Sequence, residues 1–143
     1  MTKFNLISFQ SVVFFMVMMS CKGDDPGIRL EDLQNETRTK LIGTWNSITI
    51  TKDNADVTGE FSAFTIDFSS TGFSTTNGEG IWPTSSSWDF KTGSSDVIIR
   101  NDLVEISLTF SANDTDLSMA FSLSNPGGRI TSIAGEYVFL VGR

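Results

Sequence analysis

The chain has 143 residues with 10 basic and 17 acidic side chains, and its formal net charge is −7. Nucleic acids and anionic lipid surfaces attract clustered lysines and arginines, so this acidic balance argues against both as partners. The chain contains no histidine, which excludes histidine-based triads, histidine general bases and histidine metal ligands.

The first 20 residues have the pattern of a secretory signal peptide. Lys3 precedes an apolar run from Val12 to Met19, and the small residue Ser20 stands directly before Cys21. The run is shorter than the roughly 20 apolar residues that a membrane-spanning helix needs. A charged start, a short apolar stretch and a small residue at the cut are typical of a cleaved targeting segment, so residues 1–20 are assigned to a signal peptide.

Cys21 is the one cysteine of the chain, so no intramolecular disulfide can form. The four residues Met18-Met19-Ser20-Cys21 resemble the lipid-attachment box of bacterial lipoproteins, with Met18 where leucine is usual. The resemblance implies that Cys21 takes a diacylglycerol thioether, becomes the mature N-terminus and is N-acylated. The partner expected from this motif is therefore a membrane, reached through the lipid on Cys21.

The residues after Cys21 bear on the location of the protein. Lys22, Asp24 and Asp25 resemble the export tag of surface lipoproteins in Bacteroidetes-type bacteria. The alternative is a solvated linker of the same composition, and the two readings have equal weight. The expected location is the bacterial outer membrane, facing the periplasm or the cell surface.

A tether and a short helix are predicted next. Residues 21–38 are assigned to a flexible tether, because their first part is polar and contains Pro26 and Gly27. A short helix is expected to start at Asn35 as N-cap, with Glu36 and Lys40 paired one turn apart. Gly43 is expected at its C-terminal cap, which would turn Leu41 and Ile42 toward the core.

From Thr44 onward, apolar and polar residues alternate in segment after segment, which is the signature of half-buried strands. Turn sequences such as Asn77-Gly78 separate the segments. Short antiparallel strands joined by tight turns indicate a meander, and eight of them can close into a barrel. The predicted strands cover residues 44–52, 61–68, 72–77, 85–91, 96–100, 103–111, 115–124 and 136–142.

Several short motifs in this region resemble lipocalins. Gly43-Thr44-Trp45 resembles the Gly-x-Trp motif that opens the first lipocalin strand, and Thr115-Asp116-Leu117 resembles the Thr-Asp-Tyr motif. Arg143 stands where lipocalins place an arginine stacked on the tryptophan. The resemblance implies that Gly43, Trp45 and Arg143 form the closed end of a barrel.

The same region is more specifically similar to the lipocalin-like domains of small Bacteroidetes-type lipoproteins. The similarity covers about residues 40–143 and includes Trp82-Pro83 and Ser87-Trp88-Asp89-Phe90, followed by Ala134-Gly135-Glu136-Tyr137 near the end. Residues 39–143 are therefore predicted to form an all-β domain, an antiparallel eight-stranded up-and-down lipocalin-like β-barrel. No helix is predicted after the last strand and the strands are short, so the cavity is expected to be small or filled.

Trp82 has two readings. It lies in a loop context, Gly80-Ile81-Trp82-Pro83, without strand alternation. On the rim of the barrel it could stack on a sugar or cover a hydrophobic ligand. Folded over one barrel end it would act as a plug, and this reading is favoured because large aromatic side chains gain most from burial.

Residues with catalytic or metal-binding potential are few. Asp53, Asp56 and Glu60 share one loop, but their spacing does not match a calcium loop, and a solvated connection is the favoured reading. Glu105 has no identifiable catalytic partner. The sequence therefore predicts neither a catalytic residue, a metal site nor a cofactor, and the protein is not expected to be an enzyme.

Three functions remain at this stage. The first is a membrane-anchored, monomeric lipocalin-like lipoprotein that binds a small hydrophobic or amphipathic ligand in the mouth of its barrel. The second is a filled-barrel structural or interaction subunit of an outer-membrane or cell-surface assembly. The third, an enzyme that uses carboxylates alone, is the least favoured. The volume of the cavity separates the first two, because a filled barrel has no internal space for a ligand.

Overall fold

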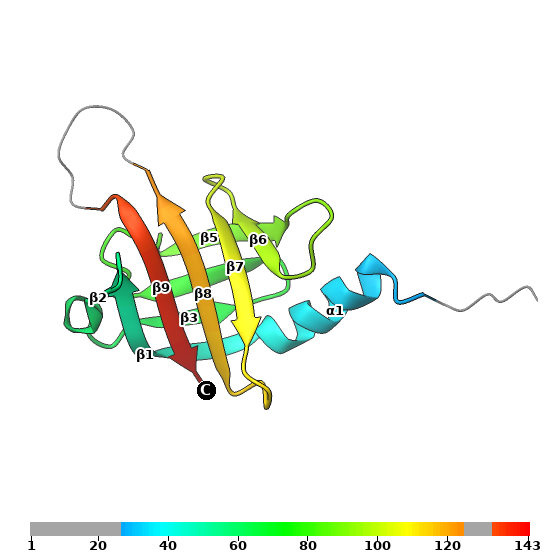
Figure 1. Ribbon diagram of the computed structural model, residues 1–143, viewed down its shortest axis with the longest axis horizontal. Helices are drawn as coiled ribbons and strands as arrows, with labels where there is room; N and C mark the ends of the chain where they lie inside the picture. Colours follow the sequence, from blue (N-terminus) through cyan, green and yellow to red (C-terminus); the bar gives the residue numbers. More distant parts are fainter. Residues whose placement is uncertain (1–26, 125–132) are drawn as a thin grey trace, which may run out of the picture.

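The computed structural model describes residues 27–124 and 133–143. Within them, one α-helix and a 3₁₀ turn accompany nine strands (Figure 1). The signal peptide, Cys21 and the predicted export tag of Lys22, Asp24 and Asp25 lie outside the described residues. The elements are α1 (Leu30–Leu41), β1 (Gly43–Lys52), β2 (Ala55–Asp56), η1 (Thr58–Phe61), β3 (Thr65–Phe68), β4 (Gly72–Thr76), β5 (Ser85–Phe90), β6 (Val97–Arg100), β7 (Glu105–Phe110), β8 (Asp116–Leu123) and β9 (Gly135–Gly142).

The strands form a closed antiparallel barrel. Strands β1 and β3 to β9 follow one another as neighbours in chain order, and β9 pairs with β1 to close the sheet. The short strand β2 forms a hairpin with the end of β1 and is not one of the eight strands that form the barrel. Closure pairs the edges that an open sheet would expose. The predicted eight-stranded up-and-down barrel is confirmed.

Strand β1 bends and thereby pairs with both β3 and β9. Its first residues, Gly43 to Asn46, pair with β3, and its later residues, Asn46 to Lys52, pair with β9. The register shifts between Ser47 and Thr49, and such a bulge bends a strand and increases its twist. The bulge thus lets one strand join the first and last parts of the meander.

Most predicted strand ends agree with the structure within two residues, but the second strand starts late. Residues 61–64 were expected in a strand, whereas Phe61 ends η1 and β3 begins at Thr65. Ala63 has a φ of 57°, in the left-handed region that a strand does not contain. Phe61 and Phe64 are both buried, so their apolar character resembles that of a strand although the backbone turns.

The helix differs most from the sequence-based expectation. It starts at Leu30, five residues before the expected Asn35 cap, and Arg29 at its N-cap makes no side-chain cap hydrogen bond. Residues 30–38 of the predicted tether are therefore helical. The predicted ion pair is present, because Lys40 Nζ lies 2.9 Å from Glu36 Oε1.

The end of the helix is also different. The helix stops at Leu41 with Ile42 as its C-cap, and Gly43 begins β1 with a φ of 124° instead of capping the helix. Leu41 is buried as expected, but Ile42 is exposed. Ile42 turns outward because the chain passes directly from the helix into an extended strand.

The lumen of the barrel is filled by side chains. Phe64 and Ile106 are fully buried, and Phe121 is nearly so. The ring of Phe139 lies 5.0 Å from that of Phe64 and 5.7 Å from that of Phe121, which places aromatic rings across the lumen. An eight-stranded barrel is just wide enough for its own side chains, and here they occupy that space.

Candidate functional site

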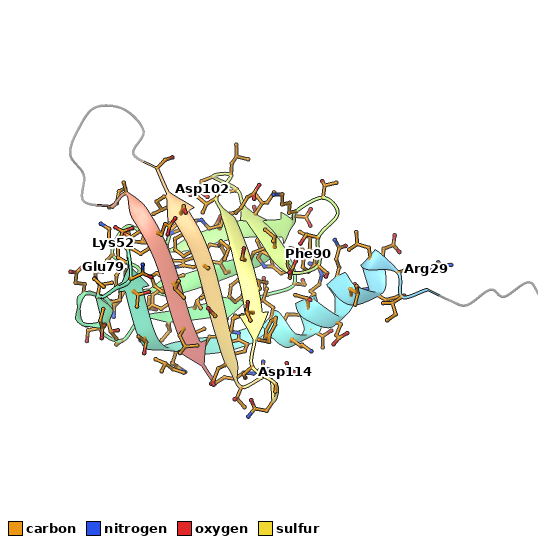
Figure 2. All side chains as sticks on the ribbon, viewed as in Figure 1. Arg29, Lys52, Glu79, Phe90, Asp102 and Asp114 are labelled. Carbon is orange, nitrogen blue, oxygen red and sulfur yellow. The ribbon has the colours of Figure 1, made fainter. Side chains whose placement is uncertain are left out.

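The two ends of the barrel are built differently. Asp102, before β7, and Asp114, after it, mark these opposite ends (Figure 2). The end near Asp114 carries α1 and is called the helix end. The end near Asp102 carries an open groove and is called the groove end.

Polar contacts hold α1 on three loops of the helix end. Gln34 Nε2 donates to the carbonyl of Ser94, 2.7 Å away, between β5 and β6. The guanidinium of Arg38 donates to the carbonyl of Ser70, between β3 and β4. Lys40 Nζ lies 3.4 Å from Asp114 Oδ1, between β7 and β8. The second half of α1 is therefore bonded to loops of the helix end while its start extends away from the strands (Figure 1), a placement that the sequence analysis did not predict.

The predicted closed-end residues meet beneath this helix. Trp45 is fully buried, and its Nε1 donates to the carbonyl of Leu41 at 2.9 Å. The guanidinium carbon of Arg143 lies 4.5 Å from the centre of the Trp45 ring. A Cβ added at Gly43 would make only an ordinary contact with Arg143 at 3.9 Å, so the φ of 124° is what favours glycine at this position. The structure thus brings Gly43, Trp45 and Arg143 together.

Trp82 closes the other end from inside. It is 2% exposed, and its ring meets those of Phe73 and Phe121 edge to face at 5.4 and 5.3 Å. Its Nε1 atom is buried without a hydrogen-bond partner among the described residues. The side chain is therefore part of the core, as the plug reading expects, and it offers no exposed face to a ligand at the rim.

A buried arginine lies beside this plug. Arg100 is 3% exposed, and its guanidinium carbon lies 5.2 Å from the centre of the Trp82 ring. It donates to both carboxylate oxygens of Asp102, at 3.0 and 2.6 Å, and to the carbonyl of Ile81 at 2.9 Å. The hydrogen bonds from Arg100 hold the pKa of Asp102 below its ordinary value.

Sequence reasoning missed Arg100, although one signal could have revealed it. Ile98 and Arg100 are two residues apart in β6, so the period of a strand puts both on the same face. Because Ile98 is fully buried, that face points into the barrel. A buried guanidinium requires hydrogen-bond acceptors, and the partly exposed carboxylate of Asp102 supplies two of them from the following turn.

An open groove of about 910 Å³ lies next to this ion pair, and it is called the rim groove. Phe121 and Tyr137 line it with stacked rings whose centres are 5.6 Å apart. Leu103 and Ile133 add aliphatic side chains, and the hydroxyl of Tyr137 donates to the carbonyl of Ile133 at 2.9 Å. The groove therefore combines a mixed apolar and polar lining with access to solvent.

The charged lining of the rim groove is mainly acidic. Asp102, Glu105 and Glu136 line it, and Arg100 is the basic residue among the lining side chains. Asp102 already engages Arg100 through two hydrogen bonds along one edge of the guanidinium. The groove thus offers more negative than positive charge to a bound molecule.

The acidic loop residues near β2 serve local structure. Asp56 Oδ1 accepts hydrogen bonds from the amide and the hydroxyl of Thr58, which lower the pKa of Asp56. Asp53 Oδ1 accepts from the amide of Glu136 at 2.9 Å. In residues 27–124 and 133–143, no three acidic or cysteine side chains lie close enough together to hold a metal ion.

Comparison with known proteins adds no relative. No family model, curated protein or solved structure matches this chain. None of the helices in the described part of the chain is long and apolar enough to cross a membrane. The barrel, its filled lumen and the rim groove are therefore the observations from which a function can be argued.

Proposed function

We propose that this protein is a membrane-anchored lipocalin-like lipoprotein that binds a small amphipathic ligand in the rim groove, and that it is not an enzyme. The observation that carries the proposal is the groove itself. Its volume of about 910 Å³ falls in the range of roughly 300–1,000 Å³ that small-molecule sites occupy. The anchor rests on the lipoprotein-like box that ends in Cys21.

The ligand site proposed here lies outside the lumen. The lumen is packed with aromatic and aliphatic side chains, so a ligand carried inside the barrel would have to displace the core. In the rim groove, a ligand can instead contact the side chain of Leu103, which is 81% exposed, above a floor formed by the buried rings of Phe121 and Tyr137. The expected mouth site is retained, but it is a surface groove.

The charge of the groove favours one kind of amphipathic ligand. Three carboxylates and one guanidinium line the groove; the guanidinium is already bonded to Asp102 and Ile81, and Glu105 is paired with Lys91 Nζ at 2.7 Å. A fatty-acid anion would bring a further negative charge without a free cation to meet it. We therefore expect a neutral or cationic head group.

A titration of the mature chain carrying Cys21→Ser, which has no lipid, tests this proposal. Neutral, cationic and anionic fluorescent amphipaths of equal chain length should be compared, with saturable binding expected for the first two. Leu103→Asn removes an apolar side chain from the groove, and asparagine tolerates the φ of 67° at this position. The loss of about 1 kcal/mol of apolar contact should weaken binding roughly fivefold.

Ile48→Asn provides the matched control. Ile48 is also an exposed aliphatic residue, at 49%, but it lies on β1 outside the groove. It should leave the affinity unchanged. Equal losses in the two variants, or the absence of saturable binding by every amphipath, would contradict a ligand site in the groove.

The filled lumen favours a second candidate, a structural or interaction subunit of an envelope assembly. In that case no amphipath binds, and a macromolecular partner contacts the outer wall. Photo-crosslinking side chains at Ile48 and Leu103 in intact cells distinguish the two candidates. A discrete adduct from Ile48, without saturable binding of amphipaths, would support the second one.

A further inference from the structure

Apolar side chains are exposed at the start of α1. Ile28 is 77% exposed, and Leu30 and Leu33 are also exposed. These three residues are called the helix tip. They precede the part of the helix that is bonded to the barrel loops, and exposed apolar groups gathered at one place indicate a contact surface.

The first turn of α1 is amphipathic. Leu30 and Leu33 are three residues apart and therefore lie on one side of the helix. Glu31 and Asp32 follow Leu30 at steps of about 100° each and lie on the opposite side. The tip can thus place its leucines in an apolar environment while both carboxylates remain in water.

The barrel holds only the later turns of the helix. The hydrogen bonds and ion pairs that fix α1 to the barrel loops come from Gln34, Arg38 and Lys40. Figure 2 shows Arg29 at the far end of α1, away from the strands. The tip therefore projects from the helix end of the barrel, and its direction is set by the docked turns.

The chain length before the tip limits its distance from the anchor. Ile28 is seven residues after Cys21. Seven residues span at most about 25 Å when fully extended. A lipid on Cys21 would therefore keep the tip within this distance of the bilayer, and the helix end is the part of the barrel that follows the tip along the chain.

We propose that the helix tip inserts into the interfacial layer of the bilayer that holds the lipid of Cys21, so that α1 orients the barrel with its helix end toward the membrane. The rim groove, at the opposite end, then opens away from the membrane. A ligand reaches it from the aqueous side and is not passed sideways out of the bilayer. This inference rests on the lipid anchor of the proposed function, and it adds the orientation and the residues that create it.

The test uses the full lipidated chain in proteoliposomes of zwitterionic phospholipid. Because the thiol of Cys21 is consumed by the lipid, a single introduced cysteine can carry an environment-sensitive fluorophore. Ile28→Cys and Leu30→Cys place the fluorophore on the tip. Leu103→Cys, at an exposed aliphatic position of the groove end, is the matched control.

The expected result is a blue shift of the fluorophore at positions 28 and 30, with quenching by spin-labelled lipid. The control at position 103 should emit as in water and respond only to a water-soluble quencher. Lipid quenching at position 103 without quenching at the tip would overturn the proposed orientation. A tip fluorophore that is shielded from water but not reached by lipid quencher would place a protein there and would also overturn it.

Flotation of the vesicles separates this inference from the proposed function. Protein that floats with the vesicles but shows no lipid quenching at the tip is anchored, and only the orientation is then wrong. Protein that does not float lacks the anchor, and both the orientation and the anchoring part of the proposed function then fail. Binding of amphipaths to the lipid-free chain is independent of either result.

Discussion

Replacing Trp45 with alanine should destabilise the barrel more than any change on its surface. The side chain is fully buried, donates to the carbonyl of Leu41 and supports the guanidinium of Arg143. Truncating a buried aromatic residue to alanine costs about 3–5 kcal/mol, because apolar contact is lost and a cavity remains. Trp45→Ala should therefore lower the free energy of unfolding by that amount and loosen α1.

Two further variants separate the contributions. Trp45→Phe keeps a ring but removes the donor to Leu41, which should cost about 1–3 kcal/mol because the carbonyl loses its partner. Arg143→Ala removes the exposed guanidinium that lies over the Trp45 ring, a contact worth about 0.5–1 kcal/mol. The expected order of destabilisation is Trp45→Ala, then Trp45→Phe, then Arg143→Ala.

Urea unfolding followed by far-ultraviolet circular dichroism measures these differences without relying on tryptophan emission. The midpoint should fall in the stated order while the slope stays constant. A Trp45→Ala variant within about 1 kcal/mol of the wild type would refute the argument that this side chain seals the helix end. Arg143→Ala that costs as much as Trp45→Ala would place the seal in the arginine instead.

Two other predictions follow from single contacts, and a third follows from the lipoprotein-like box that ends in Cys21. The folded-state pKa of Asp102 lies below its unfolded value of about 4, so its ion pair with Arg100 stabilises the protein above that pH and is lost as the pH falls through the lowered pKa. Asp102→Asn should therefore reduce the fall in urea midpoint at acid pH. An unchanged fall in the variant would contradict this. A Cβ at Gly78 would lie 2.7 Å from the carbonyl oxygen of Trp82, whereas one at Gly59 meets nothing within 4 Å. Gly78→Ala should therefore lower the melting temperature, with a loss of about 1–3 kcal/mol in the free energy of unfolding, and Gly59→Ala is the control. Equal melting temperatures for the two variants would count against this packing. Cys21→Ser should abolish palmitate labelling and leave precursor or soluble protein, whereas normal labelling of the variant would disprove the anchor.

The sequence by itself determined the strands and their closure into a barrel. Alternating residues such as Ile106 and Leu108 must lie on one face of a strand, and the short turns leave antiparallel neighbours as the available pairing. The motif around Trp45 and the final Arg143 also led to the contact that the structure contains. The alternation and the turns are local or periodic, so they can be recognised without knowledge of the packing, whereas the contact between Trp45 and Arg143 was expected from the resemblance to lipocalins.

Only the tertiary structure decided which space is empty and which is filled. The positions of Trp82 and Phe139 in the lumen depend on side chains that are far apart in the chain and meet by rotamer and volume. The sequence also did not predict how α1 contacts the barrel. Its contacts with the barrel loops come from the polar residues Gln34 and Arg38 and not from an apolar stripe. A helix held by hydrogen bonds to loop carbonyls leaves no hydrophobic period in the sequence. Its start at Leu30 and its attachment to the loops of the helix end therefore become visible only in the folded structure.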